Sequence, residues 1–216
     1  MDKLRRSLIA ALAAVLFPLP LTAGAQQPAD SAGYTTLKSD LPVETQGKVE
    51  VAEFFWYGCI HCFNLEPLLE AWVPKLPADT QFRRIPAVFN ERWAHDAAIY
   101  YSFEALGLLD KLHRPFFDAI HKDRLRTDNP AALGEWLGKN GIDQKKFEMT
   151  MKSFGVQSKV KRAVQLTAAS KIDGTPAIMV QGRYTISTEQ GRSQEGMLKN
   201  AESLIPVARK TLSATK

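Results

Sequence analysis

The sequence predicts an α/β fold whose two halves are separated in the chain by a block of helices. A strand, a helix and a second strand are predicted between residues 49 and 89. Helical patterns then follow one another from residue 91 to residue 170, and two short strands appear only after them. Because a strand–helix–strand unit of this kind is typical of a parallel sheet, the flanking parts are expected to form one sheet that the helices interrupt.

The composition excludes several classes of protein. The 216 residues are 45% hydrophobic and 24% charged, as expected of a globular chain and not of a disordered or collagen-like one. The chain has only two cysteines, which excludes a scaffold held by several disulfides. Without its first 25 residues the chain keeps 25 basic and 22 acidic residues, a net charge of +3. Such a surplus without a basic run does not indicate a nucleic-acid partner, and we expect none.

The first 25 residues have the order of a secretory signal peptide. Three basic residues precede an apolar run of 14 residues, Leu8 to Leu21, and Ala23-Gly24-Ala25 is a small-residue cleavage site. The alternative is a membrane anchor, but the run is shorter than the roughly 20 residues that a spanning helix needs. We therefore expect cleavage near Ala25, export from the cytoplasm and a soluble mature protein.

The first half of the sheet is predicted from three elements. Val49–Tyr57 is apolar, β-branched and aromatic, with Glu53 inside it, as expected of a strand that is covered on both faces. Gly58 ends this strand, a helix runs from Cys59 to Trp72, and Thr80–Phe89 is the second strand. The face that this helix buries is expected to comprise Cys62, Leu65, Leu69 and Trp72.

The rest of the chain divides into helices and then strands. Helices are predicted from Trp93 to Leu106, from Leu109 to Lys122, from Asp128-Asn129-Pro130 to Leu137, and as one long stretch after Asp143 that runs to Ala169. Two short strands, Ala177–Val180 and around Tyr184–Ile186, precede a terminal helix from Gln194 to Leu212. The chain is therefore expected to comprise a signal peptide (1–25), a discontinuous sheet domain (26–90 and 171–216) and a helical insertion (91–170).

Cys59-Ile60-His61-Cys62 is a C-x-x-C motif at the point where the strand ends and the helix begins. Cysteines three residues apart at a helix start are close enough for a disulfide that opens with little backbone motion. Cys59 is expected at the helix N-terminus, where unpaired amides and the helix dipole favour an anion. We therefore expect Cys59 to be the acidic, exposed nucleophile and Cys62 the buried resolving thiol. His61 adds positive charge or a hydrogen bond to the thiolate.

Three other uses of the cysteines are weaker. A structural disulfide that closes so short a loop removes little entropy from the unfolded chain. A zinc site needs four ligands, but no second cysteine pair exists, and His95, His113 and His121 fall in the helical block. Covalent haem attachment needs a histidine directly after the second cysteine, where this chain has Phe63. Redox chemistry by the cysteines themselves is favoured, with no metal and no cofactor.

Several motifs, taken in order, resemble one family. The signal peptide, the segment EFFWYGCIHC, a helix that contains Glu66-Pro67, the helical block and Gly174-Thr175-Pro176 are together similar to the DsbA-type thiol:disulfide oxidoreductases of the bacterial periplasm. The resemblance spans nearly the whole mature chain. It implies a thioredoxin-like fold with an inserted all-α helical domain, and a location in the periplasm.

The resemblance also implies roles for single residues. It makes Cys59 the nucleophile, Cys62 the resolving thiol and Ile60-His61 the dipeptide that tunes the redox potential. The commonest dipeptide of the family is Pro-His, so Ile60 departs from the pattern, and how oxidising the protein is stays open.

Three further residues receive roles in the same way. Pro176 matches the cis-proline that lies against the disulfide, and Thr175 matches the preceding residue, whose backbone bonds a bound peptide. Glu53 resembles the buried acid that moves protons to or from the resolving cysteine. The alternative for Glu53 is a strand carboxylate paired with Arg83 or Arg84.

The activity that the resemblance implies is donation of the Cys59–Cys62 disulfide to reduced, unfolded secreted proteins, through a mixed disulfide at Cys59. A membrane quinone-linked partner similar to DsbB is expected to reoxidise the protein, which we expect to be a monomer. Two alternatives stay open. One is a thioredoxin-like periplasmic reductase or isomerase, and the other is a peptide-binding or chaperone module whose cysteines are incidental.

Overall fold

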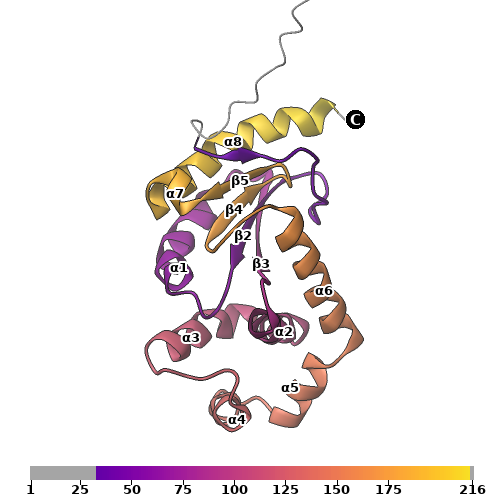
Figure 1. Ribbon diagram of the computed structural model, residues 1–216. Coiled ribbons are helices and arrows are strands. Elements are labelled where there is room, and N and C mark those ends of the chain that lie inside the picture. The colour runs from indigo at the N-terminus through magenta and orange to yellow at the C-terminus, as the bar shows by residue number, and fades with distance from the viewer. Residues whose placement is uncertain (1–32, 215–216) are drawn as a thin grey trace, which may run out of the picture.

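The computed structural model describes residues 33–214, so the signal peptide expected at 1–25 lies outside the described residues. Residues 33–214 contain one five-stranded sheet of order β1-β5-β4-β2-β3 (Figure 1). The strands are β1 (Thr35–Thr36), β2 (Val49–Phe55), β3 (Thr80–Pro86), β4 (Ala177–Val180) and β5 (Tyr184–Ser187). β2 and β3 are parallel, and the other neighbouring pairs are antiparallel. The prediction of an α/β fold is confirmed.

β2 is an internal strand and is buried along its whole length. Its side chains alternate between the two faces of the sheet, so that Ala52 and Phe54 pack in one hydrophobic cluster while Val49 and Val51 pack in the other. α1 (Ile60–Trp72) and a short 3₁₀ turn connect β2 to the parallel strand β3. The predicted strand–helix–strand unit is therefore present, although both strands end two or three residues earlier than predicted.

Five helices of the described chain follow β3 before the sheet resumes. They are α2 (Glu91–Ala105), α3 (Leu109–His121), α4 (Pro130–Lys139), α5 (Gln144–Met151) and α6 (Phe154–Ala169). The prediction of one long stretch after Asp143 was wrong, because the chain forms two helices there. Lys152 ends α5, and the Ser153 hydroxyl accepts a hydrogen bond from the amide of Val156 and so caps the start of α6.

The chain returns to the sheet after α6. β4 has the predicted bounds, β5 is one residue longer than predicted, and α8 (Gln194–Ala214) extends two residues beyond the prediction. The strand β1 and the one-turn helix α7 (Thr188–Gly191) were not predicted, because elements of two and four residues leave no periodic pattern. No helix within residues 33–214 combines the length and the hydropathy of a membrane span.

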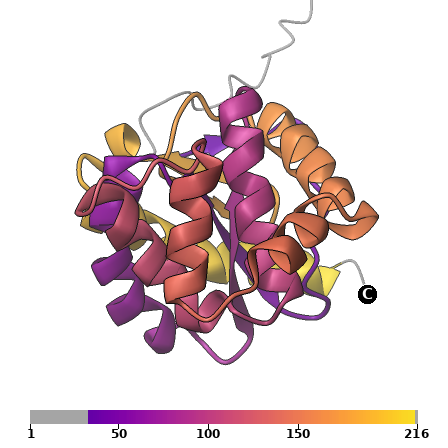
Figure 2. The same cartoon turned by 90° about the horizontal axis from the view of Figure 1, so that it is seen from below.

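Two hydrophobic clusters cover the two faces of the sheet. α8 and the buried face of α1 pack on one face, and helices α2, α3 and α6 pack with Ala52 and Phe54 on the other. Helices α2 to α5 gather beyond one end of the strands, while α6 runs back beside the sheet (Figures 1 and 2). One cluster thus joins the helices to the sheet. The domain boundaries at residues 90 and 171 stay a prediction.

Candidate active site

The turn between β2 and α1 presents the two cysteines at the start of the helix. Cys59 is the N-cap of α1, and its amide donates to the carbonyl of Trp56 over 3.0 Å. Gly58 leaves room for the Trp56 indole, since a Cβ at this position would lie 2.3 Å from it. The indole is stacked on Trp93, with 4.3 Å between ring centroids, and its Nε1 donates to Asp96 over 2.8 Å. The aromatic packing therefore determines the path of the chain into Cys59.

The Cys59 sulfur lies where a thiolate is stabilised. It is partly exposed and accepts a hydrogen bond from the amide of Cys62 over 3.4 Å. The protonated thiol also donates to the carbonyl oxygen of Thr175 over 3.3 Å. A hydrogen bond with the Cys62 side chain, and further ones from the Thr175 side chain and the amides of Cys62 and His61, lower the pKa of Cys59 from 9.0 to about 5, against the effect of burial. Cys59 is therefore a thiolate at neutral pH in the reduced protein.

The Cys62 sulfur has the opposite environment. Its side chain has no exposed surface. Burial, together with the hydrogen bond and the charge of Cys59, raises the pKa of Cys62 well above its ordinary value. The two thiols are three residues apart, yet at neutral pH one is charged and the other is not. Such a pair suits a nucleophile and a resolving thiol.

The loop before β4 completes the surface around Cys59. The Thr175–Pro176 peptide bond is cis, Pro176 is buried and Thr175 is half-buried. Both the carbonyl and the side chain of Thr175 contact Cys59, although the two residues are 116 positions apart in the chain. The two segments that the sequence suggested as parts of one site thus lie side by side.

The two residues between the cysteines are exposed. The side chain of Ile60 is 47% exposed, and the carbonyl of His61 accepts a hydrogen bond from Gln194 Nε2 over 2.6 Å. That bond ties the first turn of α1 to the first residue of α8. His61 contributes to the acidity of Cys59 through its backbone amide. A tuning role for the His61 imidazole and for Ile60 stays a prediction.

Glu53 lies inside the protein, on β2 six residues before Cys59. Its carboxylate has no exposed surface, and Arg84 Nε lies 3.3 Å from Oε2 without meeting hydrogen-bond geometry. Burial, and then the charge of Glu66, raise the pKa of Glu53 to about 8 despite the opposing effect of Arg84. Of the two arginines considered as its partner, Arg84 is the one in contact, whereas Arg83 pairs with Glu44 and Glu50.

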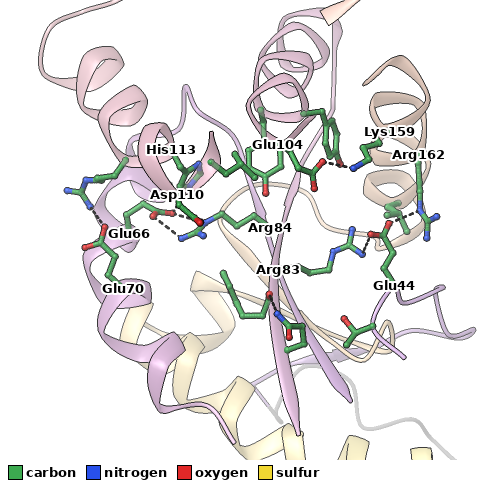
Figure 3. Close-up of a pocket in the computed structure, with 18 residues that line it drawn as sticks. Glu44, Glu66, Glu70, Arg83, Arg84, Glu104, Asp110, His113, Lys159 and Arg162 are labelled. Atoms are coloured by element: carbon green, nitrogen blue, oxygen red, sulfur yellow. Dashed lines mark hydrogen bonds and ion pairs between the residues drawn. The ribbon is translucent and has the colours of Figure 1, made fainter. Parts of the chain in front are cut away.

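A buried charge cluster, which we define as Glu53, Glu66, Arg84 and His113, lies beneath the dithiol. Arg84 reaches from β3 to Glu66 on α1 and donates from Nε and Nη2 to its two carboxylate oxygens over 3.2 and 2.9 Å (Figure 3). His113 on α3 contacts Glu66 Oε1 through Nε2 over 3.3 Å. Burial opposes ionisation of Glu66, but the bonds from His113 and Arg84 lower its pKa below the ordinary value.

Sequence reasoning missed Glu66, Arg84 and His113 as site residues. Glu66 had a detectable signal, because it falls on the buried face of α1 between Leu65 and Leu69, where an acid is unusual. Arg84 was considered only as a possible ion-pair partner of Glu53, and His113 had no signal, since a charged residue on an amphipathic helix is ordinarily solvated.

The site has no feature of a metal centre within the described residues. Residues 33–214 contain no group of three or more histidine, cysteine, aspartate or glutamate side chains placed to hold a metal ion. A C-x-x-C pair at a helix start, beside a cis-proline in a sheet of this topology, defines a thioredoxin-like oxidoreductase.

Comparison with known proteins identifies the family. Residues 75–201, more than half of the chain, match the DSBA-like thioredoxin domain, and the chain belongs to this family of oxidoreductases. The thiol:disulfide interchange protein DsbA of Azotobacter vinelandii is 39% identical over 193 residues, 88% of this chain and 90% of the relative. The DsbA of Bordetella parapertussis is 41% identical over 204 residues, 93% and 94% of the two chains. The crystal structure of Pseudomonas aeruginosa DsbA is similar with a TM-score of 0.77 at 35% identity, and the match covers 85% of this chain and 95% of that one.

Proposed function

We propose that the chain oxidises pairs of cysteine thiols in other proteins by donating the Cys59–Cys62 disulfide. The observation that supports this most directly is the opposite shift in the pKa values of the two thiols. A stable Cys59 thiolate favours the reduced dithiol over the disulfide, so electrons pass from the substrate to this protein. Each pKa unit by which Cys59 is lowered is worth about 1.4 kcal/mol.

The exchange takes two steps. A substrate thiolate attacks Cys59 Sγ, the Cys59–Cys62 bond breaks, and Cys62 leaves as a thiolate while a mixed disulfide forms. A second substrate thiolate then attacks the substrate sulfur of the mixed disulfide, and Cys59 leaves as its stable thiolate. The substrate loses two electrons and the dithiol gains them.

Glu53 is proposed to exchange a proton with Cys62. The thiolate that leaves in the first step is buried, and its high pKa means that it takes up a proton. Glu53 is protonated at neutral pH, and when it is ionised its negative charge raises the pKa of Cys62. During reoxidation the same carboxylate takes the proton back, and a pKa near the working pH suits both directions.

Thr175 and Pro176 are proposed to position the substrate peptide. The backbone of Thr175 lies within 3.3 Å of Cys59 Sγ, so a peptide whose cysteine reacts with Cys59 passes within hydrogen-bonding reach of it. An extended peptide binds such a segment through its main chain, which is independent of sequence. This agrees with substrates that share only a reduced cysteine pair.

We further propose that the mature chain acts in the periplasm on unfolded secreted proteins, as a monomer and without a nucleic-acid partner or cofactor. The order of residues 1–25 and the relatives named DsbA support this location. Because each turnover leaves the dithiol reduced, an oxidising partner is needed. A membrane quinone-linked protein similar to DsbB is proposed for that role.

The redox equilibrium with glutathione tests the proposed direction. We expect the Cys59 thiolate, followed by its ultraviolet absorbance, to titrate near pH 5. We also expect the dithiol to be favoured by at least about 100-fold over a free peptide with the same C-I-H-C segment. A thiolate that titrates like the peptide, with an equal equilibrium, would contradict the oxidase and favour a reductase or isomerase. His61→Ala in the same assay is expected to make the disulfide less oxidising.

A further inference from the structure

The buried carboxylates of Glu53 and Glu66 flank the Arg84 guanidinium beneath the dithiol, and they differ in how many hydrogen bonds they accept. Glu66 accepts two hydrogen bonds from Arg84, and His113 Nε2 lies 3.3 Å from its Oε1. Glu53 is 3.3 Å from Arg84 Nε but receives no hydrogen bond from the described residues. Since burial is nearly complete for both, the number of donors decides which of the two carries the negative charge.

Arg84 contacts both carboxylates, whereas His113 contacts only Glu66. Its ring lies between Glu66 and Tyr57, whose hydroxyl is 2.9 Å from Nδ1. A carboxylate only accepts, and burial lowers the pKa of His113 while it raises that of Tyr57, so the phenol keeps its proton. Tyr57 therefore donates to Nδ1, which leaves the histidine proton on Nε2, directed at Glu66.

We propose that His113 is a positioning residue that holds the guanidinium of Arg84 on Glu66 and so leaves Glu53 as the carboxyl that carries the exchangeable proton. The inference rests on the proposed proton exchange between Glu53 and Cys62. His113 touches no reacting atom. It acts through Glu66 and Arg84, and Tyr57 fixes its tautomer.

Among the described residues that contact the cluster, only Arg84 and His113 donate hydrogen bonds to Glu66. The titratable and charged groups that face His113 and Glu53 come from the turn after β2, α1, β3, α2 and α3. They are Tyr57, Cys59, Cys62, Glu66, Arg84, Tyr100 and Arg114. Among the described residues Arg84 is the one cation bonded to Glu66, and it also contacts Glu53.

The test is a carboxyl titration of His113→Phe. Phenylalanine keeps the ring that packs 5.3 Å from Phe55 and 5.2 Å from Phe117 but removes the donor. In the reduced protein labelled with carboxyl ¹³C-glutamate, with signals assigned from Glu53→Gln and Glu66→Gln, we expect Glu53 to titrate near pH 8 in the parent. In His113→Phe we expect this midpoint to fall by at least about one pH unit and that of Glu66 to rise. The pH profile for reoxidation by oxidised glutathione shifts in the same direction.

Two further variants separate a positioning role from packing. His113→Gln, whose amide nitrogen replaces Nε2 as the donor, is expected to restore most of the parent midpoint. His95→Gln removes a histidine that contacts the Thr127 carbonyl, remote from Glu66, and is expected to leave the midpoint unchanged. An equal fall in His95→Gln, or no recovery in His113→Gln, would overturn the inference.

The outcomes also separate this inference from the proposed function. If Glu53 titrates near pH 8 in both the parent and His113→Phe, the role of His113 is refuted while the proton exchange by Glu53 stands. If Glu53 is already ionised at pH 5 in the parent, the proposed proton exchange fails and this inference fails with it.

Discussion

The two sides of the dithiol differ in what stabilises them. On the outward side, Cys59 is held as a thiolate by short-range hydrogen bonds, from the Cys62 side chain first and also from two backbone amides of the first turn of α1. On the inward side, burial and side-chain charges keep protons on Cys62 and Glu53. The two sulfurs are nevertheless only three residues apart, at the start of α1.

The comparison teaches that the two halves of the redox reaction depend on different parts of the structure. The leaving-group character of Cys59 follows from the local geometry of a helix N-terminus, which most side-chain substitutions leave intact. After burial, the pKa of Glu53 depends on Glu66 of α1 and Arg84 of β3, and His113 of α3 contacts that Glu66. The outward side is therefore expected to tolerate substitution, and the inward side is not.

The largest expected effect separates the two sulfurs. Cys59→Ser and Cys62→Ser are each expected to lower the oxidation of a reduced peptide by roughly 1,000-fold or more, because the disulfide is lost. Only Cys62→Ser keeps the nucleophile, so only this variant accumulates a mixed disulfide with an added disulfide-containing peptide. Mass spectrometry under non-reducing conditions measures that adduct. An adduct of equal yield in Cys59→Ser would reverse the assigned roles.

Arg84→Met is the next largest disruption and is confined to the inward side. It leaves Glu66 without its bidentate partner in a buried position, which costs about 3 kcal/mol of unfolding free energy. Urea unfolding of the oxidised protein measures this loss. Arg126→Met, which breaks an exposed pair with Asp128, is the matched control and is expected to change stability little. An equal effect of the two variants would argue against the buried charge cluster.

The outward side predicts a pH-dependent difference between the redox forms. The pKa of Cys59 is lower in the folded dithiol than in the unfolded chain, so its stabilisation is complete above pH 9 and is lost as the pH falls to 5. Glu53 is present in both redox forms, so we expect its contribution to the unfolding free energy largely to cancel in the difference between them. Cys59 is partly exposed, so the full effect of the pKa shift is reduced by solvent screening. Between pH 5 and pH 7, we expect the free energy of unfolding of the reduced form to rise by about 2 kcal/mol relative to that of the oxidised form, or roughly 4 to 8 °C in Tm. Calorimetry of both forms measures the gap, and a gap that is constant with pH would contradict the thiolate.

The smallest expected effect is that of Ile60→Pro. Ile60 is the first residue of α1, where proline is favoured and no helical hydrogen bond is lost. The amides that lower the pKa of Cys59 belong to His61 and Cys62, so we expect the thiolate titration to move by less than about 0.5 pH unit. The thiolate absorbance again measures it. A larger shift would mean that the amide of Ile60 also stabilises the anion.

Much of the fold was predictable because its signals are local. The apolar, β-branched and aromatic run that contains Val49–Phe55, the apolar face of α1 and the bounds of β4 could all be recognised in short windows of sequence. The break between α5 and α6 was missed because a serine cap interrupts a pattern that otherwise continues. β1 is held by its pairing with β5, a partner almost 150 residues away, and no local pattern reports such a pairing.

The amino-acid sequence by itself determined where the thiols lie: at the junction of a buried strand and a helix, with an acid six residues earlier. That placement follows from hydrophobic periodicity and from the anion preference of helix starts, which act within a few residues. The three-dimensional packing determined that Thr175 meets Cys59, and that Arg84 and His113 are bonded to Glu66 rather than to Glu53. Burial and the distances between remote segments determine which buried carboxylate receives which hydrogen-bond donor, and a short stretch of sequence predicts neither of them.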